Sequence, residues 1–285
     1  MTIAFTGATG KLAAHLVDEL LERTEATELI ALARDPQKAT AIAERGIEVR
    51  AFDYDQPDTL AAALDGVDRL LLISGNAVGQ RVPQHEAVIN AAAEAGVSFF
   101  AYTSFLRVDQ ASLIAVAPDH KATEGLLAQA PFPVALLRNG WYTENFASRA
   151  QDAIAHGALV GSSGEGRISS ATRRDYAAAT AAVLTAATPQ PGTYELSGDE
   201  SWNLAELAAA LSEASGTTVT HRNVSRAEHR DFLIAAGTPE PLADYLTSTD
   251  AAIAAGELEN PTPGTLSRLI GRPTTPLAEL VASWV

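Results

Sequence analysis

The first half of this chain alternates between short apolar runs and helix-like segments, and that alternation restricts the fold more than any other feature. Nearly continuous apolar runs are typical of strands in a parallel sheet that helices cover on both faces. The runs lie at residues 3–5, 29–33, 49–52, 70–73, 99–102 and 134–137, and the helix-like segments at 11–22, 36–45, 58–64, 83–95 and 120–128. The pattern therefore predicts an α/β fold with a doubly wound parallel sheet.

The second half of the chain has a weaker alternation. A loop rich in Gly and Ser precedes one helix-like segment, and the stretch GTYELSG reads as one more strand. Helical and polar-loop sequence fills the rest, without an internal repeat or a linker rich enough to separate independent domains. We therefore expect a main domain at residues 1–140 and a smaller C-terminal α/β lobe at 141–285. A segment near 193–197 could return to the main sheet.

Composition and charge exclude several classes of function. The chain contains no Cys, which excludes disulfides, thiolate catalysis and Cys-ligated metals. With 35 acidic and 20 basic residues the net charge is −15, which counts against nucleic-acid binding because that needs a basic surface. No apolar run approaches the roughly 20 residues that span a bilayer, and the start of the chain lacks the features of a signal peptide. We expect a cytoplasmic protein that binds neither membrane nor nucleic acid, and no metal, because its six His residues form no ligand motif.

Two glycines stand where the first expected strand meets the first expected helix. Gly7, Gly10 and Ala13 form a G-x-x-G-x-x-A motif. Glycine lets the backbone approach a pyrophosphate, the helix N-terminus offers free N–H groups, and a small third residue lets helix and strand pack closely. The same residues also fit a plain tight turn. Their position at the first strand of an alternating pattern favours a dinucleotide site, so residues 1–140 are interpreted as a Rossmann NAD(P)-binding domain.

The second expected strand is followed by Arg34, where a cofactor without a 2′-phosphate would meet an Asp or Glu. A guanidinium suits a bidentate contact with a phosphate. Asp35 comes next, but the N-cap of the following helix explains it better. The other interpretation of Arg34 is a solvated residue at a strand end. On this position we favour NADPH over NADH.

Several motifs along the chain together resemble the NmrA-like, atypical branch of the short-chain dehydrogenase/reductase superfamily. They are FTGATGKL, ALARDPQKA, FDYDQP, LLLISG, AYTSFL, LLRNGWYTENF and LSRLIGRPTTPLAE. The resemblance covers essentially the whole chain. The glycine turn is shared widely across the superfamily, whereas RNGWYTEN and LLLISG are far more specific. Within the branch, the chain looks most like the type 2 NAD(P)H:quinone oxidoreductases, with a triphenylmethane-dye reductase as a close relative.

The resemblance implies groups of cofactor-binding residues that follow the expected strands, where open α/β sheets bind ligands. One group would wrap the pyrophosphate, one residue would meet the 2′-phosphate, one group would line the nicotinamide ribose, and the last would border the nicotinamide. In that order they are Gly7, Ala8, Thr9, Gly10, Lys11 and Leu12; Arg34; Ile73, Ser74 and Gly75; and Arg138, Asn139, Gly140, Trp141, Tyr142 and Thr143.

The chain departs from the Tyr-x-x-x-Lys motif that standard members of the superfamily use for proton transfer. If Glu124 marks the acid that usually follows this motif, His120 stands in the Lys position and Val116 in the Tyr position. The candidate donors to the reduced acceptor are a backbone N–H, Tyr142, His120 and water, and Tyr142 and His120 are the candidate catalytic residues. A His at the start of a helix is also often structural.

Trp141 and Tyr142 are the candidate substrate-binding residues. Their rings could form a flat wall for a planar substrate, or they could pack between the two lobes. The residues 141–285 would then form mainly the substrate side of the protein.

The resemblance implies a flavin-free oxidoreductase that transfers a hydride from NADPH directly to a planar small molecule, with a quinone as the favoured acceptor and the hydroquinone as product. A non-catalytic NADP(H) sensor that regulates a partner is the alternative from another class, because some NmrA-like proteins act in this way. Reduction of another conjugated acceptor, such as a triphenylmethane dye, is a third reading. A homodimer is compatible with the sequence.

Overall fold

The chain forms two units in the computed structural model, which describes residues 1–77 and 79–285. The first unit contains Met1–Phe105, Asp119–Asn139 and Arg173–Glu195. The second contains Leu106–Pro118, Gly140–Thr172 and Leu196–Val285. Both units are therefore built from segments that are separate in the sequence. That residues 1–140 fold as a domain of their own stays a prediction.

A seven-stranded sheet forms the centre of the first unit, in the order β3-β2-β1-β4-β5-β6-β8. Its strands are β1 (Ile3–Phe5), β2 (Leu29–Ala33), β3 (Glu48–Ala51), β4 (Arg69–Leu72), β5 (Phe99–Phe105), β6 (Val134–Asn139) and β8 (Gly192–Leu196). Each neighbouring pair from β3 to β6 is parallel; Ala4, for example, lies between Ile30 and Leu70. The chain order reverses between β1 and β4, as it does in doubly wound sheets.

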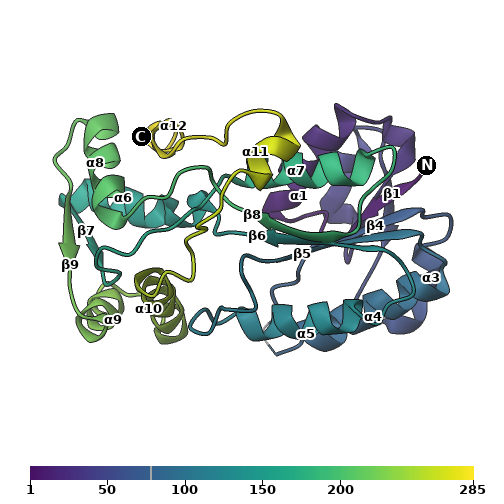
Figure 1. Ribbon diagram of the computed structural model, residues 1–285, viewed down its shortest axis with the longest axis horizontal. Coiled ribbons are helices and arrows are strands. Elements are labelled where there is room, and N and C mark those ends of the chain that lie inside the picture. The colour runs from purple at the N-terminus through teal and green to yellow at the C-terminus, as the bar shows by residue number, and fades with distance from the viewer. Residues whose placement is uncertain (78) are drawn as a thin grey trace. The chain divides into compact units, whose positions relative to one another are not determined.

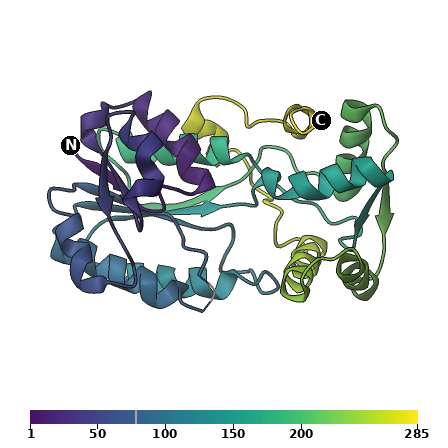
Figure 2. The same cartoon turned by 180° about the vertical axis from the view of Figure 1, so that it is seen from behind.

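Helices cover both faces of this sheet. Figure 1 shows α1 and α7 over one face and α3, α4 and α5 over the other, and Figure 2 shows the same layers from behind. The helices are α1 (Lys11–Leu21), α2 (Thr40–Ala43), α3 (Leu60–Ala63), α4 (Arg81–Glu94), α5 (Ala117–Leu127) and α7 (Arg173–Thr185). Because both faces are covered, β1, β2, β4 and β5 are buried at every position. The predicted α/β fold with a doubly wound sheet is confirmed.

Two strands run further than their apolar runs predicted. β5 continues through Phe105 and β6 through Asn139, which places Ser104 opposite Arg138. Ser104 Oγ donates a hydrogen bond to Glu124 on α5, and Arg138 donates two to the same carboxylate, at 3.0 and 2.6 Å. The ladder continues because Glu124 satisfies polar side chains on a buried face, where they would otherwise be costly.

Capping residues and short turns set the helix boundaries. Asp35 accepts a hydrogen bond from Gln37 N–H at 3.1 Å, which confirms its expected role as an N-cap. The single helices expected at 36–45 and 58–64 are wrong in detail. Each begins as a 3₁₀ turn, Pro36–Ala39 or Pro57–Thr59, and continues only as the short α2 or α3.

The second unit contains a small parallel sheet of β7 (Ala158–Gly161) and β9 (Thr220–Asn223). The sequence pattern predicted only helices and polar loops here, so this pair is a correction. β9 reads THRN and has no apolar residue, so its extended form depends on its pairing with β7 rather than on a hydropathy signal.

The helices of this unit are α6 (Ala147–His156), α8 (Leu204–Ser215), α9 (Arg226–Ala235), α10 (Glu240–Ala254), α11 (Thr265–Ile270) and α12 (Leu277–Ala282). None of the helices in the described part of the chain has the length and apolar character needed to cross a bilayer.

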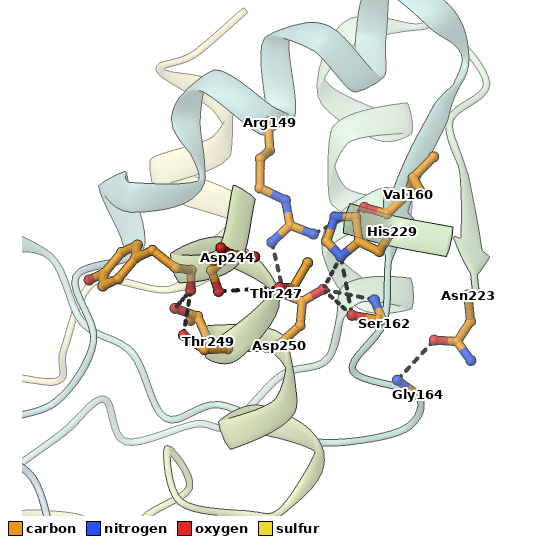
Figure 3. Close-up of polar contacts among 12 residues, drawn as sticks. Arg149, Val160, Ser162, Gly164, Asn223, His229, Asp244, Thr247, Thr249 and Asp250 are labelled. Carbon is orange, nitrogen blue, oxygen red and sulfur yellow. Dashed lines mark hydrogen bonds and ion pairs between the residues drawn. The ribbon is translucent and has the colours of Figure 1, made fainter. Parts of the chain in front are cut away.

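Asp250 on α10 joins several elements of the second unit (Figure 3). Its Oδ1 accepts a hydrogen bond from Arg149 of α6 at 3.0 Å, and its Oδ2 accepts one from Ser162 N–H, just after β7, at 2.7 Å. Nδ1 of His229 on α9 lies 3.2 Å from Oδ2. Arg149 also donates to the carbonyl of Val160 at 3.0 Å. Asp250 is fully buried, and through these contacts its carboxylate joins α6, the residue after β7, α9 and its own helix α10.

The pKa of Asp250 reflects this network. Burial alone would raise it, but Arg149 and the hydrogen bonds from His229 and Ser162 outweigh burial and hold the pKa well below its usual value of 3.8. A carboxyl with a depressed pKa in the folded state stabilises the protein above its unfolded pKa. That contribution is lost as the pH falls below 3.8 towards the folded pKa.

We expect Asp250→Asn to lower the free energy of unfolding at pH 7 by about 3–5 kcal/mol, because it leaves the Arg149 guanidinium buried without its counter-charge. Urea unfolding followed by circular dichroism measures this loss. Asp244→Asn is the matched control: Asp244 is exposed, accepts from Arg230 at 2.6 Å, and should contribute no more than about 1 kcal/mol. Equal small losses for both variants would contradict a structural role for the Asp250 network.

Candidate cofactor and active site

The glycine turn between β1 and α1 has a backbone conformation that favours glycine. Gly7 has a φ of 62°, where an L side chain is strained. Gly10 N–H donates to the carbonyl of Gly7 at 2.8 Å, and a Cβ on Gly10 would lie 3.0 Å from that oxygen. Both glycines are exposed, whereas Leu12 and Ala13 are buried. The backbone of the turn is therefore accessible to a ligand, while the first residues of α1 are packed in the core.

The N-terminus of α1 is suited to an anion. No side chain caps it, and its first turn contains no acidic residue. The first N–H groups of a helix have no acceptor within the helix, and the helix dipole is positive at this end. Thr9 and Lys11 are exposed here, and Ala8 is buried with its N–H donating to Leu32 O at 3.3 Å. A pyrophosphate would satisfy the open donors without a competing carboxylate.

Arg34 directly follows β2, the neighbour of β1. Its side chain is exposed, and it makes no hydrogen bond or ion pair with any described residue. Asp35 caps the next turn through Gln37 N–H instead of pairing with Arg34. The guanidinium is therefore available to a phosphate.

The predicted nicotinamide-ribose residues follow β4, and both neighbouring strands hold them. Ile73 N–H donates to Thr6 Oγ1 of the β1 end at 3.0 Å, and Ser74 N–H donates to Thr103 Oγ1 of β5 at 2.8 Å. Thr6 and Thr103 are buried. These threonines were not predicted as site residues, and their only signal in the sequence is a polar residue within or directly after an apolar run.

His120, a predicted proton donor, is buried on α5. Its Nδ1 lies 2.8 Å from the hydroxyl of Tyr102, and its ring stacks on Phe105 with the centroids 6.1 Å apart. Burial, followed by the positive charge of Arg81, lowers the pKa of His120 to about 3. The ring is therefore neutral near pH 7. Its position favours the structural alternative that the sequence left open.

Arg138, predicted beside the nicotinamide, is engaged by two carboxylates. In addition to its two bonds with Glu124, it donates to Glu195 of β8 at 2.9 Å. The guanidinium is almost completely buried by these contacts. We therefore assign its side chain to joining α5, β6 and β8.

Asn139 is the last residue of β6, and its amide indicates a ligand more directly than any other predicted side chain. It is 3% exposed, and neither Nδ2 nor Oδ1 has a hydrogen-bond partner among the described residues. A buried polar group without a partner costs about 1–3 kcal/mol. Such a group in a native structure usually has water, an ion or a ligand as its partner.

The predicted residues Gly140, Trp141, Tyr142 and Thr143 belong to the second unit, where residues 141–143 run beside Ser170 and Ala171. Thr143 N–H donates to the carbonyl of Ala171 at 3.0 Å, and Gly140 N–H donates to Leu196 O at 2.8 Å. Trp141 is buried, and its ring lies 6.2 Å from that of Tyr245. Tyr142 is half-buried. Trp141 thus has a packing role inside its own unit.

Comparison with known proteins identifies the family. A family described as NAD(P)H-binding matches residues 7–187, from the glycine turn through α7. The chain belongs to this NAD(P)H-binding family. The family match includes the glycine turn, Arg34 and the ends of β4 and β6.

Two bacterial reductases are similar to the chain over nearly their whole length. The chain is 47% identical to Quinone oxidoreductase 2 of Escherichia coli over 280 residues, which cover 98% of this chain and 97% of the relative. A crystal structure of an E. coli NADPH-dependent quinone oxidoreductase with NADPH matches with a TM-score of 0.95, 47% identity and 99% of each chain covered. A Citrobacter sp. triphenylmethane reductase with NADP(H) matches with a TM-score of 0.95, 39% identity and complete coverage of both chains. The predicted resemblance to NAD(P)H-dependent reductases is confirmed.

We expect Gly10→Val to weaken NADPH binding at least about ten-fold while the protein stays folded. The branched side chain would stand beside the Gly7 carbonyl, at the surface that a pyrophosphate must approach. Fluorescence titration with NADPH measures the dissociation constant, and thermal unfolding checks the fold. Gly125→Val is the control, because Gly125 on α5 is exposed, has no positive φ, like Gly10, and has nothing near its Cβ position. A folded Gly10→Val protein with unchanged affinity would make the turn purely structural.

Proposed function

We propose that this protein is a flavin-free, NADPH-dependent reductase that transfers a hydride directly to a planar acceptor, with a quinone as the favoured acceptor. The observation that carries the proposal is the 47% identity, over nearly the full length, to E. coli Quinone oxidoreductase 2. NADPH supplies the hydride when it is bound, and a quinone that takes up this hydride and one proton becomes the hydroquinone.

The residues at the ends of the first two strands fit a phosphorylated dinucleotide. We place the pyrophosphate against the exposed turn of Gly7 and Gly10 and the uncapped start of α1. Arg34 would bind the 2′-phosphate, which explains an exposed guanidinium without an internal partner. The orphaned amide of Asn139 could both donate to and accept from the carboxamide of the nicotinamide.

The proton that completes the hydroquinone needs a donor. His120 is neutral, buried and bonded to Tyr102, so it has no imidazolium proton to give near pH 7. We assign proton donation to the hydroxyl of the half-buried Tyr142 or to water. The half-buried ring of Tyr142 would offer a surface to a flat acceptor, whereas Trp141 packs against Tyr245. The homodimer and the cytoplasmic location stay predictions.

Arg34→Ala should weaken NADPH binding by about 1.5–3 kcal/mol, the contribution of a hydrogen bond to a charged group, and leave NADH binding nearly unchanged. Calorimetry with each cofactor measures both affinities. Arg45→Ala is the control, because Arg45 is a surface arginine that already pairs with Asp18 at 2.6 Å. Equal losses for NADPH and NADH would remove Arg34 from the 2′-phosphate site.

The purified protein should oxidise NADPH only when an acceptor is present, without added flavin or metal. Absorbance at the NADPH band, followed with a panel of quinones, triphenylmethane dyes and other conjugated acceptors, measures turnover. Quinones should give the highest kcat/KM. A preference for dyes would move the acceptor class towards that of the triphenylmethane reductase. Tight NADPH binding without turnover on any acceptor would favour the sensor.

A further inference from the structure

Side chains of α4 hold both backbone groups of Gly75. Gly75 N–H donates to Nε2 of His85 at 3.0 Å, and Nε of Arg81 donates to the Gly75 carbonyl at 2.6 Å. Arg81 is in turn bonded to Asp119 at 3.0 Å. Gly75 is the last of the three residues predicted to line the nicotinamide ribose, whereas neither Arg81 nor His85 was predicted to be part of the site.

The hydrogen bonds determine which nitrogen of His85 carries the proton. A backbone N–H can only donate, so Nε2 must accept from Gly75 and is unprotonated. Nδ1 lies 2.9 Å from Thr123 Oγ1, and this hydroxyl donates to the carbonyl of Asp119 at 2.9 Å. Because the Thr123 hydrogen is used in that bond, Thr123 accepts from His85 Nδ1–H. Both ring nitrogens therefore have defined roles, and these roles are compatible only with the neutral Nδ1–H tautomer.

The surroundings of His85 maintain this neutral form. The side chain is fully buried, and its ring meets Tyr102 edge to face at 5.5 Å between centroids. Burial, and then the positive charge of Arg81, lower the pKa of His85 to about 3. At neutral pH the Gly75 N–H therefore faces an unprotonated Nε2 that can accept its hydrogen bond.

The same turn has all its amide donors directed into the protein. Ile73 and Ser74 donate to Thr6 and Thr103, and Gly75 donates to His85. The Ser74 carbonyl belongs to the same trans peptide as the Gly75 N–H and therefore points away from His85. The Gly75 carbonyl is bonded to Arg81, so the Ser74 carbonyl is the acceptor that the end of β4 offers to a bound molecule. A ribose hydroxyl or a carboxamide NH₂ is the kind of group that such an acceptor binds.

We propose that His85 is a positioning residue for the dinucleotide: its unprotonated Nε2, oriented by Thr123, fixes the Ser74–Gly75 peptide so that the Ser74 carbonyl faces the nicotinamide side of the cofactor as an acceptor. The inference rests on the proposed function, because it assumes that a nicotinamide dinucleotide binds at this strand end. It extends the predicted site to two residues, His85 and Thr123, that do not need to touch the ligand.

Three variants test the inference. His85→Phe keeps a ring but removes the acceptor, and Thr123→Val removes the group that holds the Nδ1–H tautomer. Each should raise the NADPH dissociation constant and KM at least about ten-fold, the effect of one misplaced hydrogen-bonding peptide. His85→Gln restores an acceptor oxygen and should stay within about three-fold of the wild type. The KM for the acceptor should change little in all three.

His229→Phe is the matched control, because His229 is an equally buried histidine of the second unit. It should lower the melting temperature without changing the NADPH dissociation constant. Loss of affinity in His85→Phe with recovery in His85→Gln separates positioning from a general loss of stability. NADPH binding by folded His85→Phe and Thr123→Val proteins that equals wild type would overturn the inference.

Nitrogen-15 NMR of histidine-labelled protein tests the tautomer without any ligand and without His85→Phe having to fold. We expect a protonated Nδ1 and an unprotonated Nε2 for His85 between pH 5 and 8, and a changed tautomer in Thr123→Val. A wild-type His85 with a protonated Nε2 would refute the inference. Wild-type protein that turns over NADPH with a quinone while His85 shows the wrong tautomer leaves the proposed function intact. Failure of the wild type to bind NADPH overturns both.

Discussion

The parallel sheet of the first unit is the constraint on which the candidate site depends. Parallel strands place their carboxyl ends at one edge of a sheet, so residues far apart in sequence gather there. The glycine turn after β1, Arg34 after β2, Ser74 after β4 and Asn139 at the end of β6 all lie at this edge. Helices on both faces bury the strands, so most strand residues are apolar. The polar residues in or directly after the strands are therefore the candidates for binding a ligand or for holding the site in position.

Buried polar groups in this unit separate into two kinds. Glu124 with Arg138, and His85 with Thr123, satisfy one another and thereby fix strands and turns in position. Asn139 has no such partner among the described residues. In a low-dielectric interior a satisfied pair rigidifies the structure, whereas an orphaned amide is costly until something binds it. The satisfied pairs therefore hold the residues of the site in position, and the amide of Asn139 indicates where a ligand binds.

In the second unit, a buried ion pair helps to stabilise a short two-stranded sheet. Its β7 and β9 strands are short, and β9 carries polar side chains, so apolar burial alone does not hold the pair. The buried carboxylate of Asp250 contributes by bonding to α6, to the residue after β7 and to α9. Removing one member of a buried ion pair leaves the other charge buried without a counter-charge. Such a loss therefore lowers the free energy of unfolding far more than the loss of an exposed ion pair does.

The sequence by itself determined the alternation of strands and helices, the glycine turn, the N-cap at Asp35 and the basic residue after β2, because each of these depends on neighbours within a few residues. Only the tertiary structure decided that Glu124 binds Arg138 and Ser104, that His85 holds Gly75, and that THRN is a strand. It also gave His120 a hydroxyl partner and a neutral ring. These outcomes depend on which groups packing brings together, and a buried polar side chain takes its role from its partners in space rather than from its position in a motif.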